Sequence, residues 1–238
     1  MALGRDMPKH MDLIDPQHCM DLHVHSSYSS DGTAKPVDIL KTAKKMGLAG
    51  VAIVDHNNIK GGLEAARLEV EGVFAIPGIE ITSKDGGHIL AFGLAEEIPR
   101  GLAPAETVER IRELGGVPIA PHPYRFWSGL GEETTRQSGF DILEVLNARS
   151  VKKHNQKALN LAKDMGTGMT GGSDAHDLEH IGRGLTRFPN QPSSVDDALQ
   201  MLEAKKTVGE GLNRPSGDTM KYVLKSVSQW MGRGMRRM

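Results

Sequence analysis

Short apolar runs alternate along this chain with longer segments of helical period, and this alternation restricts the possible folds more than any other feature. Seven runs are candidates for strands, at residues 20–24, 50–54, 73–80, 88–94, 116–121, 141–147 and 168–172. Such alternation is typical of βα units around a mostly parallel sheet. We therefore expect an α/β fold close to a barrel.

Amphipathic helices are predicted between several of these strands. Residues 35–47, 105–116 and 152–166 have apolar side chains at helical spacing, and each segment ends with a glycine suited to the position after a helix C-terminus. Further along, residues 190–206 predict a loop, a serine cap and one more helix. At 238 residues, a single large domain is expected.

The composition excludes several classes of protein. The 29 basic and 30 acidic side chains nearly cancel, so the overall charge does not call for nucleic acid or an acidic surface as a partner. The single cysteine, Cys19, excludes an intramolecular disulfide and a cysteine-based zinc cage, and it fits a reducing compartment. No stretch resembles a signal peptide or approaches the roughly 18 apolar residues of a membrane span. We expect a soluble, cytoplasmic protein.

Side chains that bind metal ions follow the predicted strands at their C-terminal ends. In a βα barrel these ends meet at one rim, where the active site lies. The residues concerned are His23, His25, His56, Glu80, His122, Asp174 and His176. His23 and His25 are two positions apart in an extended segment, so their imidazoles point to the same side. We predict that all seven side chains converge.

Donors of these types favour a cluster of divalent ions. Imidazole and carboxylate ligands without thiolates suit Zn²⁺, Mn²⁺ or Fe²⁺. The set is too large for one tetrahedral ion, so we expect two or three ions bridged by a carboxylate, with Glu80 as the bridge. His88 differs because it opens its run, and it would reach the same rim only if that strand were antiparallel or the loop folded back. By itself, His88 is more simply a hydrogen-bonded residue.

The motifs together resemble those of a known family. DLHVHSSYSSDG, AIVDHNN, PGIE, GHIL, APHP and GGSDAH occur in this order from residue 20 to about residue 188. The ordered set is similar to that of the PHP (polymerase and histidinol phosphatase) superfamily of metal-dependent phosphoesterases. The resemblance implies a distorted (β/α)7 barrel of the PHP type, with two or three metal ions at the C-terminal rim of the strands.

The resemblance also implies how the ligands divide among the ions. His23, His25, Glu80 and Asp174 would hold a first ion, Glu80, His88 and His122 a second, and Asp31, His56 and His176 a third. Asp31 lies six positions after His25, whereas many family members have the aspartate five positions after the second histidine. The third ion therefore depends on a turn that is one residue longer.

The implied activity is hydrolysis of a phosphate ester by a metal-activated hydroxide. The substrate would be a small phosphorylated metabolite, a nucleotide or a short oligonucleotide. Asp174 would orient the nucleophile, and His176 or His56 would lie near the leaving group. Asp21 and Asp55 would either orient ligand imidazoles or hydrogen-bond at the strand ends.

Substrate binding would need cations beyond the metal ions. Three basic residues lie a few positions beyond the strand-end motifs: Arg125, Lys60 and Arg183. The nearby aromatic residues Tyr124, Phe126 and Trp127 would either stack on a base or sugar or pack within their loop. The oligomeric state is not indicated by the sequence.

We predict three segments, namely an N-terminal extension at residues 1–18, a PHP-type barrel domain at 19–212 and a basic amphipathic helix at 213–238. That helix would pack on the barrel or contact a membrane surface or RNA. Two other functions stay open. An amidohydrolase-type hydrolase commonly adds a lysine at a strand end, which these motifs lack. An inactive regulatory or nucleic-acid-binding module would have lost metal ligands, and no loss is evident.

Overall fold

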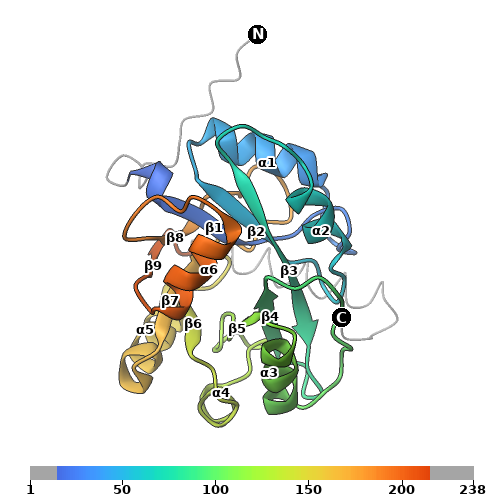
Figure 1. Cartoon of the computed structure of the whole chain (residues 1–238). Coiled ribbons are helices and arrows are strands. Elements are labelled where there is room, and N and C mark those ends of the chain that lie inside the picture. The colour runs from blue at the N-terminus through green and yellow to red at the C-terminus, as the bar shows by residue number, and fades with distance from the viewer. Residues whose placement is uncertain (1–14, 215–238) are drawn as a thin grey trace.

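The computed structural model describes residues 15–214, which form an α/β fold around a strongly curled sheet (Figure 1). The predicted C-terminal helix and most of the predicted N-terminal extension lie outside the described residues, so both stay predictions. Within residues 15–214, none of the helices combines the length and the apolar character needed to cross a membrane.

All seven predicted runs form strands. They are β1 (Cys19–Val24), β2 (Gly50–Ile53), β3 (Phe74–Thr82), β4 (His88–Phe92), β5 (Val117–Ile119), β6 (Ile142–Asn147) and β7 (Gly168–Gly172). β1, β2 and β3 are parallel neighbours, and β6 pairs with β7 in parallel. β1, β2 and β4 are buried along their whole length. Burial on both faces explains why β2 and the part of β4 after His88 appear in the sequence as continuous apolar runs.

Strand β4 is antiparallel to both of its neighbours. On β3, Thr82 pairs with His88 and Gly78 with Phe92, and on β5 Val117 also pairs with Phe92. β4 therefore begins at the end of the sheet where β3 finishes. His88, the first residue of β4, consequently lies at the same rim as the residues that follow the parallel strands.

Continuous strand pairing does not close the sheet into a complete barrel. The larger sheet has the order β5-β4-β3-β2-β1-β8-β9, and β6 and β7 form a separate two-stranded sheet. Two single bridges, Ala120 to Leu143 and Val24 to Ala175, connect the two sheets. The α/β prediction is confirmed as a curled, half-barrel sheet, but a complete (β/α)7 barrel is not.

Strands β8 (Gly184–Arg187) and β9 (Val208–Gly211) were not predicted. They form an antiparallel extension next to β1. Their sequences, GLTR and VGEG, lack the apolar run that marks a buried strand. Glycine is needed here because a side chain on Gly184 would overlap the carbonyl group of Gly172 in β7. The close backbone approach thus removes the sequence signal by which strands are recognised.

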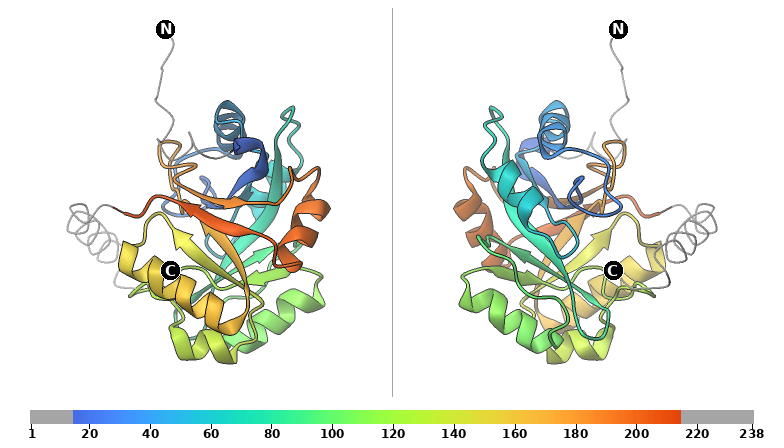
Figure 2. Two further views of the ribbon diagram at one scale, coloured as in Figure 1. Left: turned by 90° about the vertical axis from the view of Figure 1, so that its left-hand side faces the viewer. Right: turned by 90° about the vertical axis from the view of Figure 1, so that its right-hand side faces the viewer.

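Helices cover the outer side of the curled sheet (Figure 2). Four lie where the sequence predicts them, namely α1 (Pro36–Lys45), α3 (Pro104–Glu113), α5 (Lys152–Met165) and α6 (Val195–Glu203). Two short helices, α2 (Lys60–Ala66) and α4 (Glu132–Gln137), were not predicted. Gly166 ends α5 in the left-handed conformation, and the Ser194 side chain caps α6 by accepting a hydrogen bond from the Asp197 amide.

The core lies between this helical layer and the sheet. Ile39 and Leu40 of α1 pack with Val51 and Ile53 of β2, and none of the four side chains is exposed. Each such side chain contributes roughly 1.5–3 kcal/mol by leaving water. A tightly packed scaffold of this kind fixes the positions of the strand ends, and with them the polar side chains at the rim.

Candidate metal centre

Histidines from separate strand ends meet at one rim of the sheet. His23 belongs to β1 and His25 follows it, whereas His56, His122 and His176 follow β2, β5 and β7. The ring centroids of His23 and His25 are 5.2 Å apart, and those of His25 and His176 are 4.2 Å apart. His25 also lies 4.5 Å from His56, and His23 lies 5.6 Å from His122. The predicted convergence of these side chains is therefore present in the fold.

Glu80 of β3 lies at the centre of the cluster. Its carboxylate is within 3.6 Å of five imidazoles. Oε1 lies 3.6 Å from His23 Nε2, 2.8 Å from His88 Nδ1 and 3.1 Å from His122 Nε2, and Oε2 lies 3.4 Å from His25 Nε2 and 3.0 Å from His56 Nδ1. Burial by itself raises the pKa of Glu80, but the surrounding imidazoles outweigh it and hold the pKa well below its usual value. Glu80 is therefore an ionised carboxylate with both oxygens beside imidazoles, and it could contact more than one ion.

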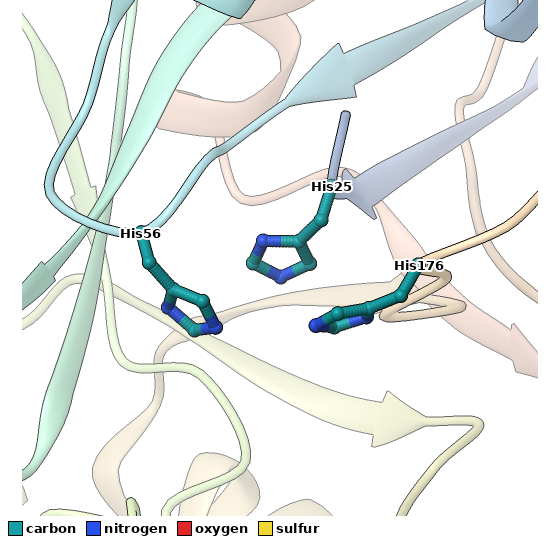
Figure 3. A group of neighbouring side chains, drawn as sticks. All are labelled: His25, His56 and His176. Atoms are coloured by element: carbon teal, nitrogen blue, oxygen red, sulfur yellow. The ribbon is translucent and has the colours of Figure 1, made fainter. Parts of the chain in front are cut away.

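The potential donor atoms form four overlapping groups, in each of which they lie within 4.8 Å of one another. The groups are His23, His25 and Glu80; His23, His122 and Asp174; His56, Glu80 and His88; and His25, His56 and His176. Figure 3 shows the three imidazoles of the last group pointing toward one another from different strand ends. These groups place His25 beside His56 and His176, where the family resemblance places Asp31.

Asp31 nevertheless lies in contact with both of its expected partners. Its Oδ2 atom is 3.1 Å from His176 Nε2, and its Oδ1 atom is 3.9 Å from His56 Nε2. Burial alone would raise the pKa of Asp31, but the hydrogen bond with His176 and the nearby positive charges lower it to about 2. The longer turn after His25 thus still brings this carboxylate to the rim.

The backbone is strained at two of the predicted ligands. His122 has a φ angle of 29° and Asp174 has a φ angle of 55°, a region that residues other than glycine rarely adopt. Asp174 is held there by a hydrogen bond from its own amide to the His23 carbonyl, at 2.7 Å. The tertiary structure therefore imposes these conformations and directs both side chains into the cluster.

Two residues that the sequence analysis missed orient the ligands. The buried Glu144 of β6 lies 2.9 Å from His23 Nδ1 through Oε1, and its Oε2 accepts a hydrogen bond from the His122 amide at 3.0 Å. Asn147, at the end of β6, donates to both Glu144 and Asp174. A carboxylate on the far nitrogen fixes the orientation of a ligand imidazole. A charged residue inside the apolar run DILEVLN was the available signal for Glu144.

Asp21 and Asp55 hold the loops of the rim rather than the imidazoles. Asp21 accepts hydrogen bonds from the amides of Ser173 and Gly182, each at 2.9 Å. Asp55 accepts from the amide and the hydroxyl group of Ser26, both at 2.7 Å. Of the two roles left open by the sequence, hydrogen bonding at the strand ends is the one present.

Of the three predicted phosphate-binding cations, one contacts the cluster. Arg125 Nη1 lies 2.6 Å from Asp174 Oδ2. Lys60 is exposed at the start of α2 and Arg183 is half-buried before β8, and among the described residues neither forms an ion pair with Asp174. Arg149, which sequence analysis missed, lies 3.0 Å from Asp174 Oδ1 and contacts His176. Arg149 closely follows the end of β6, so a search for basic residues just after the strands would have found it.

The donor set fits divalent ions. Several buried atoms make no hydrogen bond within the described part of the chain, among them Nε2 of His23 and His25, Nδ1 of His122 and Oδ1 of Asp31. Buried polar atoms without partners are costly in folded proteins, and a coordinated ion satisfies them. Burial lowers the pKa of His25 and, assisted by the charge of Arg125, lowers that of His122 to about 3. Both imidazoles are therefore in the neutral form that binds metal.

Comparison with known proteins agrees with this geometry. The PHP domain model matches residues 21–128, and the PHP-associated model matches residues 152–207. An uncharacterized protein of Methanocaldococcus jannaschii, MJ1587, is 44% identical over 140 residues, which are 54% of this chain and 81% of that protein.

Two solved structures share the fold at low sequence identity. A two-domain protein of Bacteroides vulgatus, which contains a predicted PHP-like metal-dependent phosphoesterase, has a TM-score of 0.60 at 19% identity. The match covers 82% of this chain and 64% of that one. Endonuclease Q, bound to a duplex with an abasic lesion, has a TM-score of 0.62 at 22% identity, over 82% of this chain and 60% of the endonuclease.

The fold and the site thus define an α/β protein with a histidine- and carboxylate-rich candidate metal centre at the strand ends. The chain belongs to the PHP domain family.

Proposed function

We propose that this protein hydrolyses a phosphate ester with the help of two or three divalent ions held at the rim. The observation that carries the proposal is the Glu80 carboxylate surrounded by five imidazoles, next to an Asp174 carboxylate that two guanidinium groups contact. A phosphate ester needs both kinds of group, because its nucleophile must be activated and its negative charge neutralised.

The ligands of the ions would be the buried side chains of the rim. Glu80 would bridge, and the others would be His23, His25, Asp31, His56, His88, His122, Asp174 and His176. Bound divalent ions of this kind lower the pKa of a water molecule and neutralise phosphoryl oxygens. Glu144 keeps the Nε2 atom of His23 directed into the cluster by holding its Nδ1 atom.

The exposure of the histidines separates their proposed roles. The side chains of His23 and His25 are completely buried, whereas those of His56 and His176 are 8% and 13% exposed. A side chain beside the leaving group must lie where substrate can reach it. His56 and His176 therefore suit that place, while Asp174 orients the attacking oxygen and Arg125 and Arg149 meet the phosphoryl oxygens.

The two alternative functions have less support. Within the described residues none of the strands ends in a lysine, which an amidohydrolase-type site commonly adds. An inactive module would have lost ligands, whereas each predicted ligand is present at the rim. A small phosphorylated molecule, a nucleotide and a short oligonucleotide all fit a site that recognises phosphate.

Metal analysis of the purified protein, followed by assays with each metal, tests this proposal. The substrates are p-nitrophenyl phosphate, the bis-p-nitrophenyl diester and a panel of nucleotides. His23→Ala and Asp174→Ala should abolish metal binding or turnover, whereas His18→Ala, a histidine outside the cluster, should retain both. Absence of near-stoichiometric transition metal, or full activity in the two cluster variants, would contradict the proposal.

A further inference from the structure

The loop between β5 and α4 carries two aromatic side chains that are open to solvent. Phe126 is 82% exposed and Trp127 is 64% exposed, and their rings meet edge to face with centroids 4.7 Å apart. Large aromatic rings usually leave water when a protein folds, because each buries a large apolar surface. An exposed pair of them therefore indicates a surface that contacts a partner molecule.

This aromatic pair directly follows a residue that contacts the candidate metal centre. Arg125, the residue before Phe126, points inward and contacts Asp174 at 2.6 Å, and it also donates to Asn147 Oδ1 at 2.6 Å. Consecutive Cα atoms are about 3.8 Å apart. The backbone of Phe126 and Trp127 therefore lies within two such spacings of the Arg125 backbone, so a molecule longer than its phosphate could extend from Arg125 toward this pair.

The surroundings of the loop are basic. Lys157 Nζ of α5 lies 5.3 Å from the centroid of the Tyr124 ring, which places α5 against the loop. Burial lowers the pKa of His154, and so do the charges of four nearby basic residues, Lys157, Arg125, Arg214 and Lys153. The Arg214 amide donates to the Ser150 carbonyl, so that residue also lies at the start of α5.

Acidic groups near the loop are already engaged by cations or hydroxyl groups. Glu132 accepts a hydrogen bond from the Tyr124 hydroxyl group at 2.6 Å and pairs with Arg136, which also pairs with Asp164. The charge beside the aromatic pair is therefore complementary to a polyanion. An apolar partner protein would not need these basic residues.

We propose that Phe126 and Trp127 form a stacking platform for the bases of a single-stranded nucleic acid whose phosphate lies at the metal centre. This inference rests on the proposed function and names its substrate class. Every nucleobase offers a flat π face, so stacking on aromatic rings accepts any sequence, and neighbouring cations follow the backbone. The nearly neutral overall charge does not oppose this, because a local group of cations is sufficient to attract a phosphate backbone.

A comparison of substrates with and without bases tests the platform. Three substrates are assayed with the metal-loaded enzyme: a short single-stranded oligonucleotide, the same backbone with abasic positions next to the scissile phosphate, and p-nitrophenyl phosphate. In the double variant Phe126→Ala/Trp127→Ala, the KM for the oligonucleotide should rise by about tenfold, because stacking on one aromatic ring is worth that much or more. The KM for p-nitrophenyl phosphate and for the oligonucleotide with abasic positions should stay the same. The variant Phe126→Tyr/Trp127→Phe keeps both rings and should behave like the wild type.

A binding measurement in EDTA separates this inference from the proposed function. Trp127 is one of two tryptophans in the sequence, so Trp230→Phe leaves it as the single indole reporter. Addition of the oligonucleotide should quench its fluorescence, and the abasic oligonucleotide should quench it much less. Quenching without any hydrolysis by the metal-loaded enzyme would refute the proposed function and retain the platform.

Two results would overturn the platform itself. One is hydrolysis of the oligonucleotide with the same KM in the wild type and the double alanine variant. The other is unchanged Trp127 fluorescence together with self-association that the double alanine variant abolishes in sedimentation experiments, since the pair would then cover a second copy of the chain.

Discussion

The Oε1 atom of Glu144 lies 2.9 Å from Nδ1 of His23, on the side of the imidazole opposite to the Nε2 atom that faces Glu80. Both side chains are almost fully buried. Glu144 therefore sets the rotation of a ring whose other nitrogen belongs to the metal centre, although Glu144 stands outside the four donor groups.

Replacement of Glu144 by glutamine should weaken metal binding. The amide keeps the shape of the side chain but loses the charge that holds the His23 imidazole, and loss of such a partner typically lowers metal affinity 10- to 100-fold. Competition with a chromophoric chelator measures the change. Glu203→Gln on the exposed end of α6 is the matched control and should leave affinity unchanged. Equal affinity in the two variants would show that Glu144 does not orient His23.

Replacement of either guanidinium on Asp174 should impair substrate binding. Arg125→Ala and Arg149→Ala are each expected to raise the KM for a phosphate ester by roughly 10- to 100-fold, since a hydrogen bond to a charged group contributes about 1.5–3 kcal/mol. Metal content, measured on the same samples, should stay at the wild-type level. Arg183→Ala is the control. A comparable rise of KM in that variant would contradict a specific role of Arg125 and Arg149 in binding phosphate.

A methyl group at Gly172 should disturb the metal centre through packing alone. A Cβ atom there would overlap the Cβ atom of His23 and come within 2.8 Å of Glu144 Oε1. Gly172→Ala should therefore lower the free energy of unfolding by about 1–3 kcal/mol and weaken metal binding. At the other end of β7, a Cβ atom at Gly168 would meet its neighbours at 3.3 Å or more, so Gly168→Ala should be much milder. Thermal unfolding with and without metal distinguishes the two, and equal losses would contradict the packing argument.

Cys19 should make stability sensitive to alkaline pH. Burial, assisted by the charge of Glu210, raises the pKa of this thiol from 9.0 to about 12. Because the folded pKa lies above the unfolded one, the contribution of this group is fully present below pH 9 and is lost as the pH rises toward 12. Cys19→Ala should show a shallower loss over this range in denaturant titrations.

The same burial should protect the Cys19 thiol from reagents in the native protein. At pH 8 a thiol reagent should react with it only after unfolding. Rapid reaction of the native protein would show that Cys19 is more accessible than its buried position indicates.

The local pattern of the sequence was sufficient for most of the scaffold. Each of the seven apolar runs forms a strand, and the longer helices lie where helical spacing and their ends place them. Helices α2 and α4 were not predicted because KGGLEAA and EETTRQ are short and have no clear apolar stripe. Strands β8 and β9 were not predicted because they have glycines, in place of the apolar residues of an ordinary strand, where they cross β7.

Some residues of the candidate site could likewise be predicted from the sequence, and others could not. The position of the donors at strand ends was enough to predict that they lie together, because the last side chains of parallel strands reach one rim. The same criterion could not identify Glu144, whose side chain reaches His23 across 121 positions of sequence. Nor could it separate Arg125, which contacts Asp174, from Lys60 and Arg183, which follow similar motifs.

The sequence by itself determined which residue types stand at the strand ends and, through the two-residue repeat of an extended chain, that His23 and His25 face the same side. Only the tertiary structure decided which donors are neighbours across the sheet, with His25 next to His56 and His176 and Asp31 in contact with the last two. The physical reason is that spacing along a strand is fixed by backbone geometry, whereas distances between strands depend on how strongly the whole sheet curls.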